Sequence, residues 1–205
     1  LKGVAGLKYE DACRSFKSFV GEEASRFRLL VDGNQLSEED KETYRRLIEP
    51  ERNGEGIYAM SDELLQQSLL LLSGLLAKYY GRKVILLIDE YDVPLDKAFQ
   101  HGYYDQMVML IRNLFGNALK TNPDLQFAIL TGCLRISKES IFTGMNNFQV
   151  YSISETEFDE WFGFTRSEVQ QMLEHYGIAD HAAEAKEWYD GYRFGNTYVY
   201  CPWDI

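Results

Sequence analysis

Two acidic residues that directly follow an apolar run are the strongest candidates for chemistry in this chain. Asp89 and Glu90 come after residues 84–88, five apolar residues with no polar alternation. Such a run is typical of a central strand of a parallel sheet, buried on both faces. Ligands of open parallel sheets bind beyond the carboxyl ends of the strands, where these two carboxylates would lie. The pattern therefore predicts that Asp89 helps to hold Mg²⁺ and that Glu90 orients or activates a water molecule.

An apolar strand that ends in Asp-Glu is the Walker B pattern of P-loop ATPases. The pattern is short, and an ordinary exit from a strand into a loop is the alternative. The phosphate-binding pattern G-x-x-x-x-G-K-[ST] is absent, because no Gly in the chain is followed by Lys. The sequence opens at Leu1 without a Met, so we expect an upstream portion that carries the phosphate-binding loop.

A second apolar run, residues 126–131, ends in Thr131 and Gly132. In P-loop enzymes with an added strand beside Walker B, a polar residue at this strand end contacts the γ-phosphate or the attacking water. Thr131 is placed for that role, and a hydroxyl that caps the turn is the alternative. Arg135 and Lys138 follow closely and would either meet phosphate or pair with the acidic residues.

Four acids, Asp89, Glu90, Asp92 and Asp96, fall within eight positions. Carboxylates this close repel one another unless a cation or an Arg compensates them, which favours a Mg²⁺ site. We expect only Asp89 and Glu90 to face the site, with Asp92 and Asp96 in a turn at Pro94.

Other candidates are weaker. Glu184-Ala-Lys186 matches the letters of a nuclease E-x-K but lies in a helical pattern, so we reject it. The three histidines have no ligand spacing. Residues 188–195 are dense in aromatics, which would either stack on a base or pack in a turn, and the packed turn is favoured.

The order of expected elements predicts an α/β fold, namely a P-loop NTPase-like parallel sheet that is incomplete at its N-terminus, with a C-terminal helical subdomain. Residues 1–153 would form the core without its Walker A segment, and residues 154–205 the subdomain. Apolar spacing, caps and turn signals predict the elements. They are helices at 9–27, 37–48, 61–80, 103–120, 154–161, 165–176 and 180–189, strands at 84–88, 126–131 and, more weakly, 148–153, and a linker after Pro94.

Composition limits the class of protein. The 205 residues are 45% hydrophobic, which allows a sizeable core. The net charge of −11 argues against broad adhesion to nucleic acid. Three widely spaced cysteines support neither a disulfide framework nor a zinc site, and no apolar run could span a bilayer. We expect a cytoplasmic protein with no membrane contact.

Taken together, four segments resemble the predicted AAA-ATPase-like family of bacterial proteins. They are residues 87–94, residues 130–147, residues 188–195 and Cys201-Pro-Trp203, in this order and spacing. The resemblance covers essentially the whole chain. Members of the family carry a phosphate-binding loop near the N-terminus, and many carry a restriction-endonuclease-like domain after the ATPase region.

The resemblance implies ATP and Mg²⁺ as ligands, with Asp89 as the acid associated with Mg²⁺ and Glu90 as the catalytic acid. It makes Thr131 and Arg135 candidates for sensing phosphate. The chain would then be a fragment of an ATP-binding and ATP-hydrolysing protein, with weak or no hydrolysis by itself. One alternative is a non-hydrolysing scaffold that binds a protein partner or a second copy. The other is an accessory module of a DNA-acting nuclease, with DNA contacted only through a further C-terminal domain.

Overall fold

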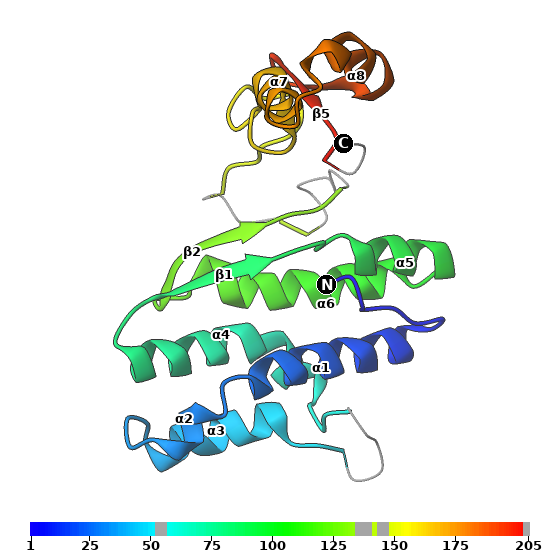
Figure 1. The fold of residues 1–205 in the computed structure, drawn as a ribbon. Coiled ribbons are helices and arrows are strands. Elements are labelled where there is room, and N and C mark those ends of the chain that lie inside the picture. The colour runs from blue at the N-terminus through cyan, green and yellow to red at the C-terminus, as the bar shows by residue number, and fades with distance from the viewer. Residues whose placement is uncertain (52–56, 134–140, 143–147, 203–205) are drawn as a thin grey trace. The chain divides into compact units, whose positions relative to one another are not determined.

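The computed structural model describes residues 1–51, 57–133, 141–142 and 148–202. The chain divides into two compact units, residues 1–147 and residues 148–205, and each is described by itself below (Figure 1). Arg135 and Lys138, which were predicted to lie near phosphate or the acids, fall outside the described residues.

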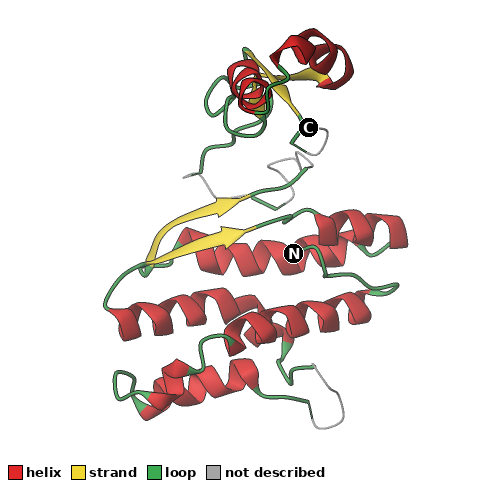
Figure 2. Ribbon diagram, viewed as in Figure 1, coloured by secondary structure: helices red, strands yellow, loops and turns green. Residues whose placement is uncertain are grey.

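The first unit is mostly helical (Figure 2). Its helices are α1 Tyr9–Ser25, α2 Leu29–Asp32, α3 Glu38–Ile48, α4 Asp62–Tyr80, α5 Val93–His101 and α6 Tyr104–Phe115, the last continued by a π-helical turn, Gly116–Lys120. The predicted helices at 9–27, 37–48, 61–80 and 103–120 are confirmed to within a few residues. Local caps explain the agreement for α3 and α4: Ser37 and Ser61 accept backbone N–H groups at their starts, and Gly81 ends α4 in the left-handed region at φ +64°.

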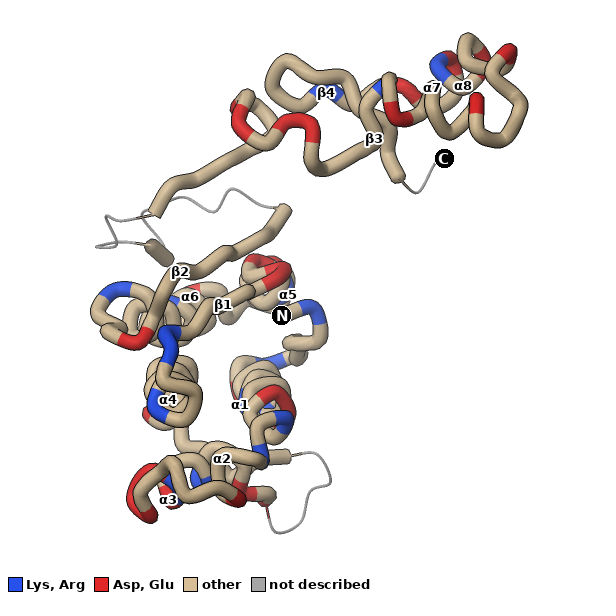
Figure 3. The backbone as a smooth tube through the Cα atoms, turned by 60° about the vertical axis from the view of Figure 1, so that its left-hand side comes forward, with Lys and Arg blue, Asp and Glu red and all other residues tan. Residues whose placement is uncertain are grey.

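Strand β1, Val84–Ile88, pairs in parallel with β2, Leu125–Leu130, in a register that aligns Ile88 with Leu130. The intervening helices α5 and α6 make this a β-α-β crossover. Figures 1 and 3 both show the helices of this unit on one side of the two strands. The strands predicted at 84–88 and 126–131 are confirmed to within one residue.

The prediction that β1 is buried on both faces is wrong, because one face of this strand is exposed. Alternate side chains of the two strands are exposed, namely Ile85, Leu87, Phe127 and Ile129. Leu87 is 73% exposed. The described helices of this unit cover one face of the sheet, so every second residue of these apolar runs is exposed on the other.

The linker predicted after Pro94 is also wrong, because helix α5 occupies this stretch. Pro94 lies in the first turn of the helix, where its missing N–H would have had no partner. Gly102 ends the helix at φ +80°, in the left-handed region that favours glycine.

The main core of the first unit lies between α1, α4, α5 and α6. Its fully buried side chains include Phe16, Leu65, Met107 and Phe115. A second, smaller cluster forms around Leu30 and Tyr44, whose hydroxyl donates to the Ala24 carbonyl at 2.7 Å. Since α4 contributes to both clusters, it joins the α2–α3 end of the unit to the rest.

The second unit mixes helices with an antiparallel sheet. It contains β3 Phe164–Thr165, α7 Arg166–His175, the 3₁₀ turn Ala179–His181, α8 Ala182–Tyr189, β4 Asp190–Phe194 and β5 Thr197–Tyr200, with sheet order β3-β5-β4. The helices predicted at 165–176 and 180–189 are confirmed, and Thr165 with Glu168 forms the predicted capping box.

Other predictions for this region are wrong. Residues 148–153 form no strand and residues 154–161 form turns instead of a helix. A purely helical subdomain was expected, whereas β4 and β5 form a hairpin. The aromatic run 188–195 spans the end of α8 and β4 and is not a packed turn, since Trp188 is 73% exposed and Tyr192 is exposed as well.

Within the described ranges, the helices are too short or too polar for any of them to cross a membrane.

Candidate functional site

The carboxyl ends of β1 and β2 lie side by side because the strands are parallel and in register. The residues that follow, Asp89 and Glu90 after β1 and Thr131 after β2, therefore come together as the sequence predicted. The Thr131 hydroxyl donates a hydrogen bond to Asp89 Oδ1, across 42 positions of the chain. The nitrogen of Leu1 lies here too, 2.5 Å from the carbonyl oxygen of Asp89.

The backbone bulges at Glu90. The Thr131 N–H donates to the Ile88 carbonyl at 2.9 Å, and the Tyr91 N–H donates to the Thr131 carbonyl at 3.1 Å. In a regular parallel ladder the second bond would come from residue 90, so one extra residue is accommodated between the two bonds. Glu90 adopts φ +52°, which is uncommon for any residue other than glycine.

The carboxylate of Glu90 is held partly out of solvent. Its Oε2 atom is buried and has no hydrogen-bond partner among the described residues. Among the residues that the structure describes, no Lys or Arg side chain forms an ion pair with Asp89 or Glu90. Figure 3 shows further acidic positions where β1 leads into α5. An unpaired buried carboxylate oxygen is costly, so this strand end favours a cation or a hydrogen-bond donor from a ligand.

The acids at the strand end would suit a Mg²⁺ ion that is also bound by water and phosphate oxygens. Among the described residues no three His, Cys, Asp or Glu side chains are arranged to hold a metal ion. Mg²⁺ in phosphate-handling sites is bound by one or two carboxylates together with water and phosphate oxygens, and needs no cage made only of protein. Asp89, which is exposed at the strand end, and Glu90 with its unpartnered oxygen suit that arrangement.

The two other acids of this segment, Asp92 and Asp96, lie in different surroundings. Asp96 lies in the first turn of α5, where its carboxylate accepts a hydrogen bond from Gln100 Nε2 at 2.7 Å. Asp92 was expected to share that position, but it is only 3% exposed and packs against Gly132. Sequence reasoning missed Asp92 and Gly132. The glycine directly after a polar strand end was the available signal, because such a position allows close approach of another segment.

Cys133 and Cys13 lie in opposite environments, and this predicts their reactivity. Cys133 is exposed beside Gly132, whereas Cys13 is buried and its thiol donates to Asp62 Oδ1 at 3.5 Å. Burial, with a smaller contribution from the Asp62 charge, raises the pKa of the Cys13 thiol from 9.0 to about 11. Since only the thiolate reacts, a two-unit rise lowers its fraction at pH 8 about 100-fold.

We therefore expect iodoacetamide at pH 8 to modify Cys133 at least 100-fold faster than Cys13, as followed by peptide mass spectrometry. The rate at Cys13 should climb as the pH rises toward 11. In denaturant the two rates should become similar, which is the control. Rapid modification of Cys13 in the folded protein would contradict the burial of this face of α1.

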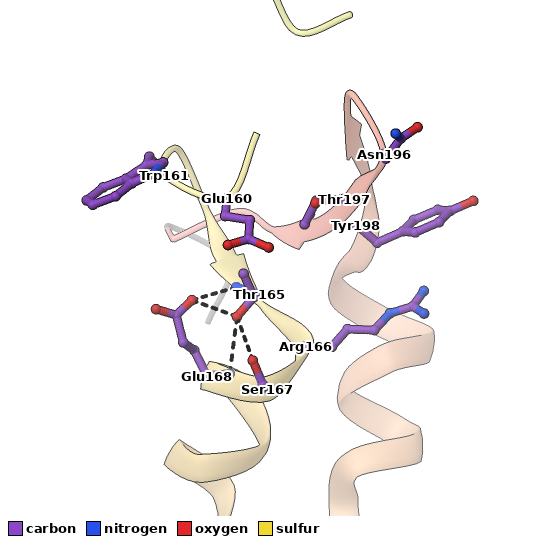
Figure 4. A pocket seen from close by; sticks show the side chains of 9 residues that line it. All are labelled: Glu160, Trp161, Thr165, Arg166, Ser167, Glu168, Asn196, Thr197 and Tyr198. Atoms are coloured by element: carbon purple, nitrogen blue, oxygen red, sulfur yellow. Dashed lines mark hydrogen bonds between the residues drawn. The ribbon is translucent and has the colours of Figure 1, made fainter. Parts of the chain in front are cut away.

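The second unit contains an open depression whose lining is shown in Figure 4. Polar groups of Thr165, Arg166 and Glu168 in this lining bond within the unit. The Thr165 N–H and hydroxyl both donate to Glu168 Oε2, and Arg166 pairs with Asp190 at 2.7 Å. The Arg166 guanidinium also lies over the Tyr198 ring, 4.7 Å from its centroid. These interactions stabilise the start of α7 against the hairpin.

The fold and the strand-end site together define an α/β protein with a pair of acids after a parallel strand, a class to which nucleotide-handling proteins belong. The family model described as "Predicted AAA-ATPase" matches residues 11–142, and the chain belongs to this family. No solved structure matches the chain.

A curated relative from Azotobacter chroococcum mcd 1 is named "Uncharacterized protein in vnfD 5'region". It is 29% identical over 126 residues, which cover 61% of this chain and 24% of the relative. The chain thus spans about a quarter of the length of that relative.

Proposed function

We propose that this chain supplies the part of an ATP-hydrolysing site that holds Mg²⁺ and aligns the attacking water. Asp89 is the Mg²⁺-associated acid, and Glu90 is the acid that orients the water. The observation that carries the proposal is the bulge after β1. It turns Glu90 out of the ladder and leaves a buried carboxylate oxygen that bonds no described residue, next to the exposed Asp89. A rare backbone conformation of this kind clusters at functional sites. Membership of the predicted AAA-ATPase family supports the same assignment.

The roles follow from the chemistry of phosphoryl transfer. Bound Mg²⁺ would neutralise charge that develops on the β- and γ-phosphates. Asp89 would hold that ion, and Glu90 would accept a hydrogen bond from water and direct its attack. Thr131, which here donates to Asp89, would exchange that bond for one to the γ-phosphate or the water. Arg135 is proposed to contact phosphate, and the geometry of that contact lies outside the described residues.

The G-x-x-x-x-G-K-[ST] pattern of a phosphate-binding loop is absent from these 205 residues, since no Gly is directly followed by Lys. Hydrolysis therefore requires phosphate-binding groups that this stretch does not contain. We expect the full-length protein to hydrolyse ATP in a Mg²⁺-dependent reaction and the 205-residue chain alone to show no turnover above background.

Steady-state release of phosphate, measured with and without EDTA, tests this expectation. Turnover by the 205-residue chain that disappears in its Glu90→Gln variant would contradict the need for a separate phosphate-binding loop. Absence of both ATP binding and turnover in the full-length protein would refute the proposed function itself.

A second candidate is a scaffold that binds a protein partner without hydrolysis. The exposed apolar face of β1 and β2 favours it, because Ile85, Leu87, Phe127 and Ile129 form adjacent alternate positions on paired strands. ATP binding without turnover in the full-length protein would make this candidate the leading one.

A further inference from the structure

Asp92 is a buried carboxylate to which the proposed chemistry gives no role. It is 3% exposed, whereas the neighbouring acid Asp89 is exposed. Burial of a carboxylate is costly unless the group makes compensating interactions. Asp92 lies two residues after Glu90 and begins α5, where its carbonyl accepts the N–H groups of Leu95 and Asp96, both at 3.0 Å.

The Asp92 side chain packs against the one residue of the β2 end that has no side chain. A Cβ added to Gly132 would lie 2.7 Å from Asp92 Oδ1 and 2.9 Å from Tyr91 Cε1. Real Cβ atoms do not approach so closely, so any other residue at position 132 would push Asp92 and the Tyr91 ring away. Gly132 is therefore required for this contact as the structure has it.

The residues on both sides of Glu90 are held as well. Before it, Ile88 accepts the Thr131 N–H. After it, the Tyr91 N–H donates to the Thr131 carbonyl. The Tyr91 ring packs edge-on against the Phe142 ring, with 5.6 Å between the ring centroids. The Phe142 ring in turn stacks on the ring of Phe115 in the core, with 6.5 Å between the ring centroids. Burial of its phenol, with a smaller contribution from the Asp92 charge, raises the pKa of Tyr91, which agrees with a fixed and enclosed position for this ring.

We infer that Asp92 is a positioning residue, whose contact with Gly132 holds the Glu90 bulge in its left-handed conformation. Glu90 has an unfavourable φ and can remain there only if the surrounding structure holds it. The Thr131 backbone bonds the residues on both sides of the bulge, and the Asp92–Gly132 contact adds a further restraint after it, at the start of α5. This inference rests on the proposed function only for what Glu90 does chemically. The mechanical part of it stands on the contacts of Tyr91, Asp92 and Gly132.

Hydrogen exchange tests the mechanical part without ATP. The Tyr91 amide should exchange slowly because it is bonded to the Thr131 carbonyl. We expect Gly132→Ala and Asp92→Ala to raise its exchange rate about tenfold or more, and Asp92→Asn, which keeps the shape of the side chain, to stay within about threefold of the unmodified chain. Gly116→Ala is the matched control, since a Cβ there meets nothing within 4 Å.

Protection of the α6 amides in the same experiment shows whether each variant is folded. Should Gly132→Ala fail that check, Asp92→Ala decides the question. Unchanged exchange at Tyr91 in a folded Asp92→Ala variant would overturn the inference.

Kinetics of the full-length protein tests the link to Glu90. With bulge positioning lost, Asp92→Ala should lower kcat about tenfold and leave KM for ATP within about threefold, because the water is misaligned while nucleotide contacts remain. A purely structural role would predict wild-type kcat in the folded fraction. Faster exchange at Tyr91 together with an unchanged kcat would overturn the positioning role. A full-length protein without any turnover would instead refute the proposed function and leave the exchange result standing.

Discussion

In the full-length protein, Glu90→Gln is expected to lower steady-state ATP turnover roughly 100-fold or more, with the affinity for ATP changed less than about threefold. Gln keeps the size of the side chain but cannot accept a proton from water, and it orients the attacking water less strongly. Glu90 would act mainly in the transition state, so its replacement should reduce kcat and leave binding intact. Phosphate release and fluorescent-nucleotide titration measure the two quantities separately.

Asp96→Asn is the matched control for this variant. It makes the same acid-to-amide change within the same acidic segment, but Asp96 bonds Gln100 within α5 and has no role in the proposed chemistry. We expect its turnover to equal that of the unmodified protein. A Glu90→Gln variant that hydrolyses ATP at the normal rate would exclude Glu90 as the water-aligning acid.

Phe115→Ala is expected to destabilise the first unit by about 3–5 kcal/mol, the largest effect on stability that we predict. Phe115 is fully buried at the end of α6 in the main core. Its removal leaves a cavity and deletes the stacking partner of Phe142. Since Phe142 contacts the Tyr91 ring, the loss should also loosen the residue that follows Glu90.

Urea unfolding followed by circular dichroism measures the free energy of unfolding of each variant. Met109→Ala on the same helix is the matched control, because Met109 is 62% exposed, and it should change that free energy by less than about 0.5 kcal/mol. A loss below about 1 kcal/mol for Phe115→Ala would show that this core is not packed as described.

The positions of most helices could be predicted because their signals are local. Ser37, Ser61 and Thr165 each bond a backbone N–H three residues ahead, so the residues that start these helices are readable without knowledge of the fold. The hairpin of β4 and β5 also had a local signal, since Gly195-Asn196 precedes the alternating run Thr197–Tyr200. Aromatic density was interpreted there as packing, and the turn signal was overlooked.

By itself, the sequence determined that two apolar strands end in polar residues and that parallel pairing would bring Asp89, Glu90 and Thr131 together. Only the tertiary structure decided how they meet. The bulge at Glu90 depends on bonds to Thr131, and the burial of Asp92 depends on the missing side chain of Gly132, about forty positions away along the chain. The exposure of one face of the sheet was likewise decided by where the helices packed. Contacts between residues so distant in sequence leave no local pattern, because each partner on its own is compatible with many neighbours.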